Sequence, residues 1–226
     1  MEIKPNEIFD FKGILLKAIE TENMTENGIE YVDLGLPSDT MWATCNVGAD
    51  SQFDNGLLFQ FGRVDGYRYG DKNHKFRTHK ENNQDNGCGF IPITTSGKVY
   101  EENDILDLKD DAAHVNMGGR WKMPTKNQLD ELFNNTTRKV ETLNGVKGVL
   151  FKSKINGHQL FIPFDGYWSN GSFYDAGSYV NLWSSQMHTY DIHSGYVLIC
   201  GSDCNNYVDD CFRYDALSVR GVFNKE

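Results

Sequence analysis

The sequence predicts an α+β fold with an antiparallel β core. Short apolar runs separated by turns fill most of the 226 residues, and 22 Gly and 5 Pro favour many turns over long helices. Two segments nevertheless have the three- and four-residue apolar spacing of a helix. With 39% hydrophobic residues, the chain is long enough to bury the core of an ordinary globular domain.

An N-terminal helix is predicted first, because apolar residues recur three or four positions apart at Ile8, Phe11, Leu15 and Ile19. The polar run that follows indicates a linker, so we divide the chain into a helix and linker at 1–28 and a domain at 29–226. The helix either packs on its own domain or serves in docking or homo-oligomer assembly.

Short strands are predicted from Tyr31 onward, in YVDLGLPSDT, MWATCNV and GLLFQFGR. Residues 64–90 are polar and rich in Gly and Asn, which indicates a long surface excursion. A second helix is predicted at Thr125, because Gln128 follows it by three residues as in a capping box. Beyond it, VKGVLFKS and HQLFIPF flank an Asn-Gly turn and predict a β-hairpin. Three further strand candidates follow: YVNLWSSQ, SGYVLICG and ALSVRGVF.

The charge balance narrows the classes of partner. A net charge of −10 and a pI near 5.0, with no cluster of Lys and Arg, argue against nucleic acid and against an anionic membrane surface. The N-terminus lacks the uninterrupted apolar region of a signal peptide, and no segment predicts membrane insertion. Five cysteines, an odd number, favour free thiols. We therefore expect cytoplasmic synthesis, with virion association or display by a non-classical route left open.

Four stretches are distinctive: EYVDLGLPSDTMWATCNVGA, GLLFQFGR, DDAAHVNMGGRWKMPTKNQLDELF and NLWSSQ. Through them, from about Tyr31 to Phe223, the chain resembles the major-paralogous-domain proteins of gut bacteria and phage, which are related to formylglycine-generating enzymes. The resemblance implies a C-type-lectin-like fold with short antiparallel strands, one or two packed helices and long loops. It also implies that four tryptophans belong to the scaffold: Trp42, Trp121, Trp168 and Trp183. Asp110, Asp111 and His114 would hold a loop by hydrogen bonds.

One branch of that family comprises the variable proteins of diversity-generating retroelements, which bind ligands through residues whose codons were randomised at adenines. Such codons cannot become Lys, Glu, Gln, Met or Trp. From His188 to Asp215, 28 consecutive residues contain none of these types, although the rest of the chain uses them freely. The resemblance therefore implies a variable C-terminal region at about 184–216. Within it, the aliphatic run YVLI indicates a fixed strand.

The predicted ligand-binding residues are His188, Tyr190, Asp191, His193, Ser202, Asp203, Asn205, Asn206, Tyr207, Asp209, Asp210, Phe212 and Tyr214. Tyrosine supplies contact area at low entropic cost, and Ser and Asn supply adaptable hydrogen bonds, as in antibody paratopes.

Three cysteines of this region, Cys200, Cys204 and Cys211, have the spacing C-x3-C-x6-C, which is not that of a zinc finger or ribbon. A disulfide would need Cα atoms within roughly 7 Å, which the sequence does not show. The nearby carboxylates lack the Asp-x-Asp-x-Asn-Gly loop with a distal Glu that binds calcium. We predict no metal and no cofactor, and interpret the cysteines as draws from a randomised codon set; a metal and a disulfide remain the less favoured alternatives.

An enzyme is the remaining class to weigh. Formylglycine-generating enzymes use a reactive cysteine pair that binds copper, but their flanking signature is not present in SDCNNYVDDCFRY. Neighbouring acids also raise the pKa of a thiol and disfavour the reactive thiolate. No G-x-S-x-G elbow, P-loop or H-E-x-x-H motif occurs in the chain.

We therefore predict a non-enzymatic ligand-binding protein of receptor or adhesion type, whose C-terminal face is diversified by a retroelement to vary target specificity. Its expected partner is a protein or glycan on a cell surface. A fixed-specificity surface or fimbrial-type adhesin domain of the same fold is the first alternative, and a formylglycine-generating-type copper oxidase is the second.

Overall fold

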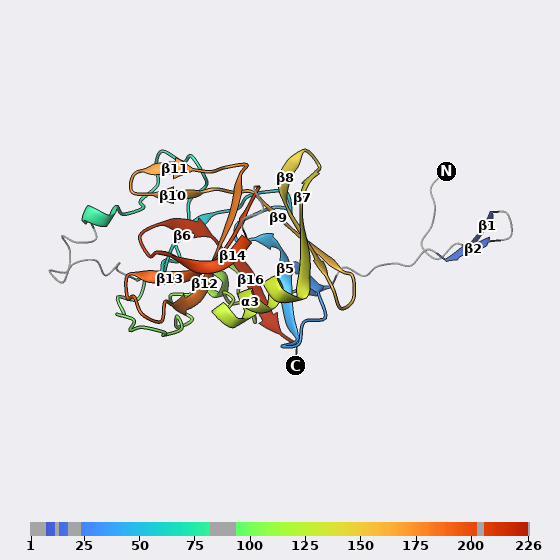
Figure 1. Ribbon diagram of the computed structural model, residues 1–226, viewed down its shortest axis with the longest axis horizontal. Coiled ribbons are helices and arrows are strands. Elements are labelled where there is room, and N and C mark those ends of the chain that lie inside the picture. Colours follow the sequence, from blue (N-terminus) through green and yellow to red (C-terminus); the bar gives the residue numbers. More distant parts are fainter. Residues whose placement is uncertain (1–7, 12–13, 18–23, 82–93, 203–205, 226) are drawn as a thin grey trace.

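The computed structural model describes residues 8–11, 14–17, 24–81, 94–202 and 206–225 (Figure 1). Among the described residues, strands make up 42% and helices 10%, and the sheets are curled. The prediction of an α+β fold is therefore wrong, and the molecule is mostly β. The described helices α2 (Ala112–Met117) and α3 (Lys126–Asn135) are only six and ten residues long, so strands and loops provide most of the packing against the sheets.

The predicted N-terminal helix is also wrong. Residues Ile8–Phe11 (β1) and Ile14–Lys17 (β2) pair as an antiparallel two-stranded sheet. The apolar residues that suggested a helical face are mostly β-branched or aromatic, and these types favour strands. Gly13 in the middle of the segment would in addition cost a helix about 1 kcal/mol.

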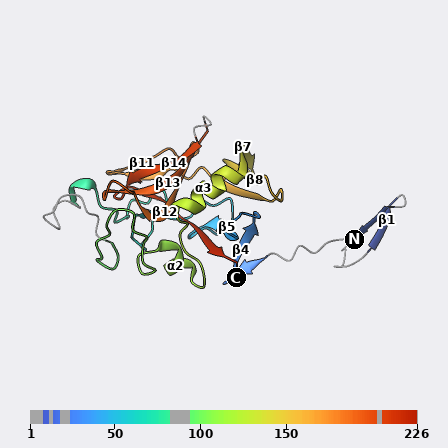
Figure 2. The same cartoon turned by 60° about the horizontal axis from the view of Figure 1, so that its bottom comes forward.

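Three sheets build the rest of the protein (Figures 1 and 2). The largest has seven strands, in the order β11 (Ser172–Tyr174), β10 (Tyr167–Ser169), β15 (Ala216–Ser218), β12 (Tyr179–Met187), β13 (Ser194–Gly201) and β14 (Asn206–Phe212), with β6 (Leu58–Gln60) pairing with β15. The second has the order β16 (Arg220–Asn224), β5 (Thr40–Asn46), β4 (Ile29–Asp33) and β3 (Thr25–Glu26). The third has the order β7 (Thr136–Leu143), β8 (Val146–Ser153) and β9 (Gln159–Pro163).

Local signals in the sequence located several of these elements correctly. Helix α3 begins after Thr125, whose side chain accepts a hydrogen bond from the Gln128 N–H while the Gln128 side chain accepts one from the Thr125 N–H. The hairpin of β8 and β9 is confirmed, as are strands β12 and β13. The segment ALSVRGVF forms two strands instead of one, because β15 joins the seven-stranded sheet and β16 joins the four-stranded sheet.

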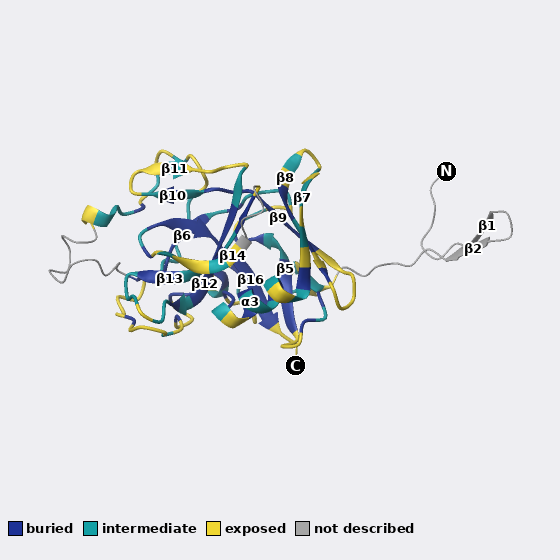
Figure 3. Cartoon of the chain, viewed as in Figure 1, coloured by how far each residue is buried: buried dark blue, intermediate teal, exposed yellow. Residues whose placement is uncertain are grey.

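The core lies on both faces of the seven-stranded sheet (Figure 3). The first core cluster includes Trp121 and Trp183, and the second includes Trp42 and packs beneath α3. Trp168 belongs to a third, smaller cluster. The prediction that all four tryptophans are scaffold residues is confirmed, since each has an exposed fraction of 0%.

Two smaller predictions concern loops. Asp111 accepts hydrogen bonds from the N–H groups of His114 and Met123, and Asp110 accepts one from the Tyr100 hydroxyl, so this motif holds a loop as expected. The excursion at 64–90 is described to residue 81, and Phe76 within it is buried against Trp168. Over the described ranges, no helix is both long and apolar enough to span a membrane.

Candidate ligand-binding surface

The segment from His188 to Tyr214 forms one side of the seven-stranded sheet. It comprises the loop between β12 and β13, then β13 and β14, and the turn that leads to β15. Because β14 is the last strand of the sheet, the segment occupies a margin of the molecule, where β14 is partly exposed (Figure 3).

Burial divides this segment into a scaffold and an exposed set. Val197 and Leu198 of β13 have exposed fractions of 0%, and they contribute to the first and second core clusters respectively. Tyr190, Tyr207 and Phe212 have exposed fractions of 84%, 43% and 49%. The centre of the run YVLI is therefore buried, Tyr196 and Ile199 at its ends are half-buried, and the large exposed side chains come from the segments on either side of it.

Not every predicted site residue is available to a ligand. The Asp191 carboxylate accepts hydrogen bonds from the His193 N–H (2.9 Å) and the Ser194 hydroxyl (2.8 Å). Partial burial acts to raise the pKa of Asp191, but these hydrogen bonds outweigh it and hold the pKa below its usual range. His188 packs its ring edge-on against Tyr196 at 4.9 Å. These residues shape the loop before β13.

The exposed residues gather on β14 and beside it. Asp209 and Asp210 are exposed, and neither carboxylate has an ion pair or hydrogen bond with a described residue. Phe212 stacks on Tyr214 with ring centroids 5.1 Å apart and an interplanar angle of 11°, which makes an aromatic platform at the end of β14. Ser202 is exposed before β14.

Three further predicted site residues and Cys204 are described only in part or not at all. Asn206 pairs with Cys200 at the start of β14. Asp203, Cys204 and Asn205 lie outside the described residues.

Arg213 lies beneath the candidate surface and supports it, although the sequence analysis did not single it out. Its side chain is fully buried, its Nη1 donates to the Ile192 carbonyl at 3.1 Å, and its guanidinium lies 5.5 Å from the centre of the Phe61 ring. Burial lowers the pKa of Arg213 to about 10, and its electrostatic interactions with Tyr100 and Asp110 oppose that shift. The sequence did offer one signal for it, because Arg213 is the only arginine in residues 188–215, which contain no lysine.

The two described cysteines of the region do not form a joint site. Cys200 packs in the second core cluster and Cys211 packs against the first, so their side chains lie on opposite faces of the sheet. Burial raises the pKa of Cys200 to about 12. Burial, and then the neighbouring Asp215, raise the pKa of Cys211, whose thiol donates to the Asp215 carboxylate at 3.1 Å. Both thiols are therefore protonated at neutral pH and poorly suited to nucleophilic or metal chemistry.

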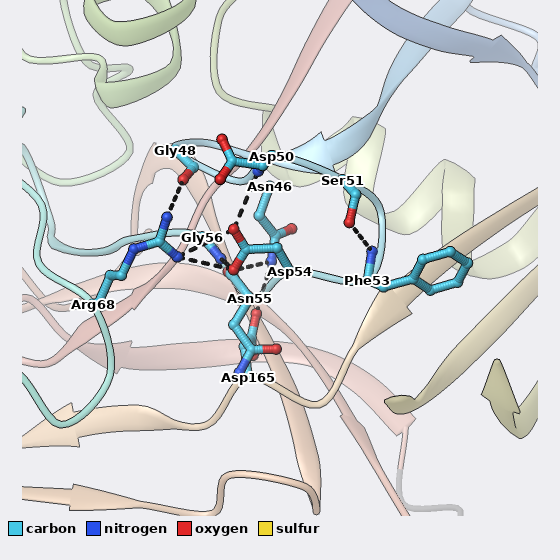
Figure 4. Close-up of polar contacts among 10 residues, drawn as sticks. All are labelled: Asn46, Gly48, Asp50, Ser51, Phe53, Asp54, Asn55, Gly56, Arg68 and Asp165. Carbon is cyan, nitrogen blue, oxygen red and sulfur yellow. Dashed lines mark hydrogen bonds and ion pairs between the residues drawn. The ribbon is translucent and has the colours of Figure 1, made fainter. Parts of the chain in front are cut away.

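Two cavities lie elsewhere, next to the loop that follows β5, whose polar contacts are drawn in Figure 4. Their volumes are about 550 and 510 Å³, and Phe53 lines both. Asp54 holds the loop, since its carboxylate accepts hydrogen bonds from the N–H groups of Asp50 and Gly56 and from Arg68. Neither cavity is lined by a residue of 188–214.

Among the described residues, no group of three or more His, Cys, Asp or Glu side chains could hold a metal ion. Comparisons of the chain with protein-family models, with curated proteins and with solved structures found no match.

Proposed function

We propose that this protein is a non-enzymatic ligand-binding protein of receptor or adhesion type, and that residues 188–214 carry recognition. One observation supports this most directly. Exposed side chains of the segment, including Tyr190, Tyr207 and Phe212, are mounted around a strand whose central residues are fully buried. A rigid support beneath exposed aromatic and polar side chains is the arrangement that a binding surface requires.

The chemistry of the surface fits a protein or glycan ligand on a cell surface. Exposed tyrosines offer an apolar face and a hydroxyl, and the carboxylates of Asp209 and Asp210 offer hydrogen-bond acceptors. The raised thiol pKa of Cys211 argues against the alternative of a copper oxidase, which would pair Cys211 with Cys204.

We further propose that a retroelement diversifies this surface, as in the family that the sequence resembles. The support is compositional and spatial together. The stretch without Lys, Glu, Gln, Met or Trp coincides with the exposed margin of the sheet, and its buried strand offers a place for invariant residues.

Deep sequencing of natural variants of the gene tests diversification. Replacements are expected to concentrate at the codons of Tyr190, Tyr207 and Phe212, while those of Val197 and Leu198 stay constant. An even distribution of replacements along the chain would instead support a fixed-specificity adhesin.

A binding experiment tests recognition itself. The protein is applied to arrays of glycans and cell-surface proteins, and Tyr207→Ala is expected to weaken any ligand found by at least tenfold. Tyr174→Ala is the matched control, because Tyr174 has a similar exposed fraction of 44% and lies on β11 outside the segment. Equal loss with both variants would contradict the proposed location of the site.

A further inference from the structure

Strand β14 ends the order of the seven-stranded sheet, and no strand of the described residues pairs with its outer edge. A strand edge offers a row of backbone N–H and C=O groups to which another extended chain can pair. The question is which of these groups are available here and which kind of chain they would accept.

The register of β13 and β14 identifies the outward groups. The Arg213 N–H donates to the His193 carbonyl at 2.9 Å, and Ser194 lies opposite Phe212. Because hydrogen-bonded and non-hydrogen-bonded pairs alternate along an antiparallel ladder, even-numbered residues of β14 direct their backbone groups away from β13. These residues are Asn206, at the start of the strand, and then Val208, Asp210 and Phe212.

Most of these outward groups have no partner. The Phe212 carbonyl accepts a hydrogen bond from the Asp215 N–H at 2.9 Å. No described residue hydrogen-bonds to the outward N–H and C=O groups of Val208 and Asp210, or to the Phe212 N–H. We call these five groups the outer edge of β14.

The side chains around the outer edge indicate the charge of its partner. Asp209 and Asp210 are adjacent, so their carboxylates lie on opposite faces of the sheet, and both are exposed. A strand added at this edge therefore meets a negative charge on each face. Exposed Tyr207 and Phe212 lie near the two ends of the row.

A second copy of the same strand is a poor occupant. Antiparallel pairing of two β14 strands about their centres would bring the aspartates of one copy close to those of the other. Like charges facing each other across a strand pair are destabilising, and each chain already carries a net charge of −10. The charges favour a strand with basic side chains instead.

We propose that the outer edge of β14 binds an extended segment of a partner protein by strand addition, with lysine or arginine side chains of that segment facing Asp209 and Asp210. This inference rests on the proposed function and names the partner of the same surface. Main-chain hydrogen bonds supply affinity, while the two carboxylates and the flanking aromatic side chains select the sequence.

The probe is an end-blocked heptapeptide of threonine and valine with two adjacent lysines at its centre. Amide hydrogen exchange of the full chain, followed residue by residue by NMR, is measured with and without the peptide. Strand addition predicts new protection at the N–H groups of Val208, Asp210 and Phe212. The N–H groups of Tyr207, Asp209 and Cys211, already directed to β13, should change little.

Three comparisons separate backbone pairing from charge. Methylation of alternate peptide nitrogens should weaken binding at least tenfold, because it removes the N–H groups that pair with the strand. Replacement of both lysines by glutamate should also weaken binding at least tenfold. In the protein, Asp210→Pro removes an outward N–H, whereas Asp210→Asn removes only the charge, so the proline variant should lose more affinity. Proline at an outward edge position leaves the β13 ladder intact.

Several outcomes would overturn the proposal. One is equal binding of the peptide and its methylated form, a comparison that uses only the wild-type protein. Another is no binding of the peptide at all, in which case the two aspartates would serve to prevent other strands from pairing with this edge. Dimerisation in sedimentation that Asp210→Pro abolishes would identify a second copy as the occupant. An array ligand that requires Tyr207 but tolerates Asp210→Pro would refute strand addition and leave the proposed function standing. If the peptide protects the N–H groups of Val208, Asp210 and Phe212 but no array ligand depends on Tyr207, strand addition is supported and the proposed site of recognition is not.

Discussion

At the scale of single residues, the buried amide of Asn46 connects the carboxylate of Asp165 to the guanidinium of Arg220. Asn46 donates its Nδ2 to the Asp165 carboxylate at 3.0 Å and accepts the Nε of Arg220 on its Oδ1 at 2.8 Å (Figure 4 shows Asn46 and Asp165). Burial raises the pKa of Asp165 to about 7, although the Arg220 charge and the Asn46 hydrogen bond both act to lower it. One oxygen of the carboxylate has no partner among the described residues.

This pKa predicts how stability varies with pH. An unfolded aspartate titrates near pH 3.9, so between about pH 4 and 7 the native state binds the proton more tightly than the unfolded state does. The free energy of unfolding should therefore fall by about 2–3 kcal/mol between pH 5 and 8 from this group alone. Urea titrations of Asp165→Asn should lack that fall, while the exposed control Asp39→Asn should keep it. Parallel pH profiles of wild type and Asp165→Asn would contradict the assignment.

A second prediction at this scale concerns Gly195 on β13. A Cβ at this position would lie 2.5 Å from the buried Phe61 ring. Gly195→Ala should therefore destabilise the protein by about 1–3 kcal/mol, measured as a shift of the urea midpoint. Adding Phe61→Leu, which shortens the side chain that clashes, should cost less in the alanine variant than in the wild type. Strict additivity of the two changes would show that the clash is relieved elsewhere.

At the scale of elements, the start of α3 is the best-specified feature of the chain. Helix α3 packs across β12, β13 and β14, so it covers one face of the strands that carry the candidate surface. Thr125→Ala removes the side-chain acceptor of the capping box and should lower the free energy of unfolding by about 1 kcal/mol. Thr125→Asp retains an acceptor and should restore most of the loss. Equal urea midpoints for Thr125→Ala and wild type would contradict this role.

The elements also show where sequence reasoning works. The capping box at Thr125 and the paired apolar strands around Asn156-Gly157 are local signals, and both elements were predicted correctly. The apolar residues of the N-terminal segment fit the spacing of a helix or of a strand. Which of the two forms depends on a neighbouring strand, and Ile8–Phe11 pairs with Ile14–Lys17. The split of ALSVRGVF at Val219 depends in the same way on two different sheets.

At the scale of the whole molecule, the order of the strands could not be predicted from the sequence. β16 lies beside β5, and β6 lies beside β15, although each pair is separated by most of the chain. The candidate surface was predicted as a segment, but its division into exposed and buried residues depends on this long-range pairing. Asp191 and Arg213 illustrate the difference, since only the folded loop shows that they hold it in place.

Arg220 of β16 links the four-stranded sheet to the three-stranded sheet. Its Nη1 donates to the Ala43 carbonyl of β5 at 3.1 Å, and its Nη2 donates to the Phe161 carbonyl of β9 at 3.4 Å. It has no exposed surface, and burial lowers its pKa to about 10, while its electrostatic interactions with Cys45 and Asp165 oppose that shift. The guanidinium thus satisfies acceptors from two sheets while its charge stabilises the buried Asp165 carboxylate.

Removing this group should therefore destabilise the whole molecule. Arg220→Ala is expected to lower the free energy of unfolding by about 3–5 kcal/mol at pH 8, because it leaves carbonyls and an ionised Asp165 buried without a cation. The loss should be smaller at pH 5, where Asp165 is protonated, and smaller in the Asp165→Asn background. Arg220→Lys keeps the charge with fewer donors and should fall between. A cost of Arg220→Ala that is the same at both pH values and in both backgrounds would show that the guanidinium acts only through its hydrogen bonds between the sheets.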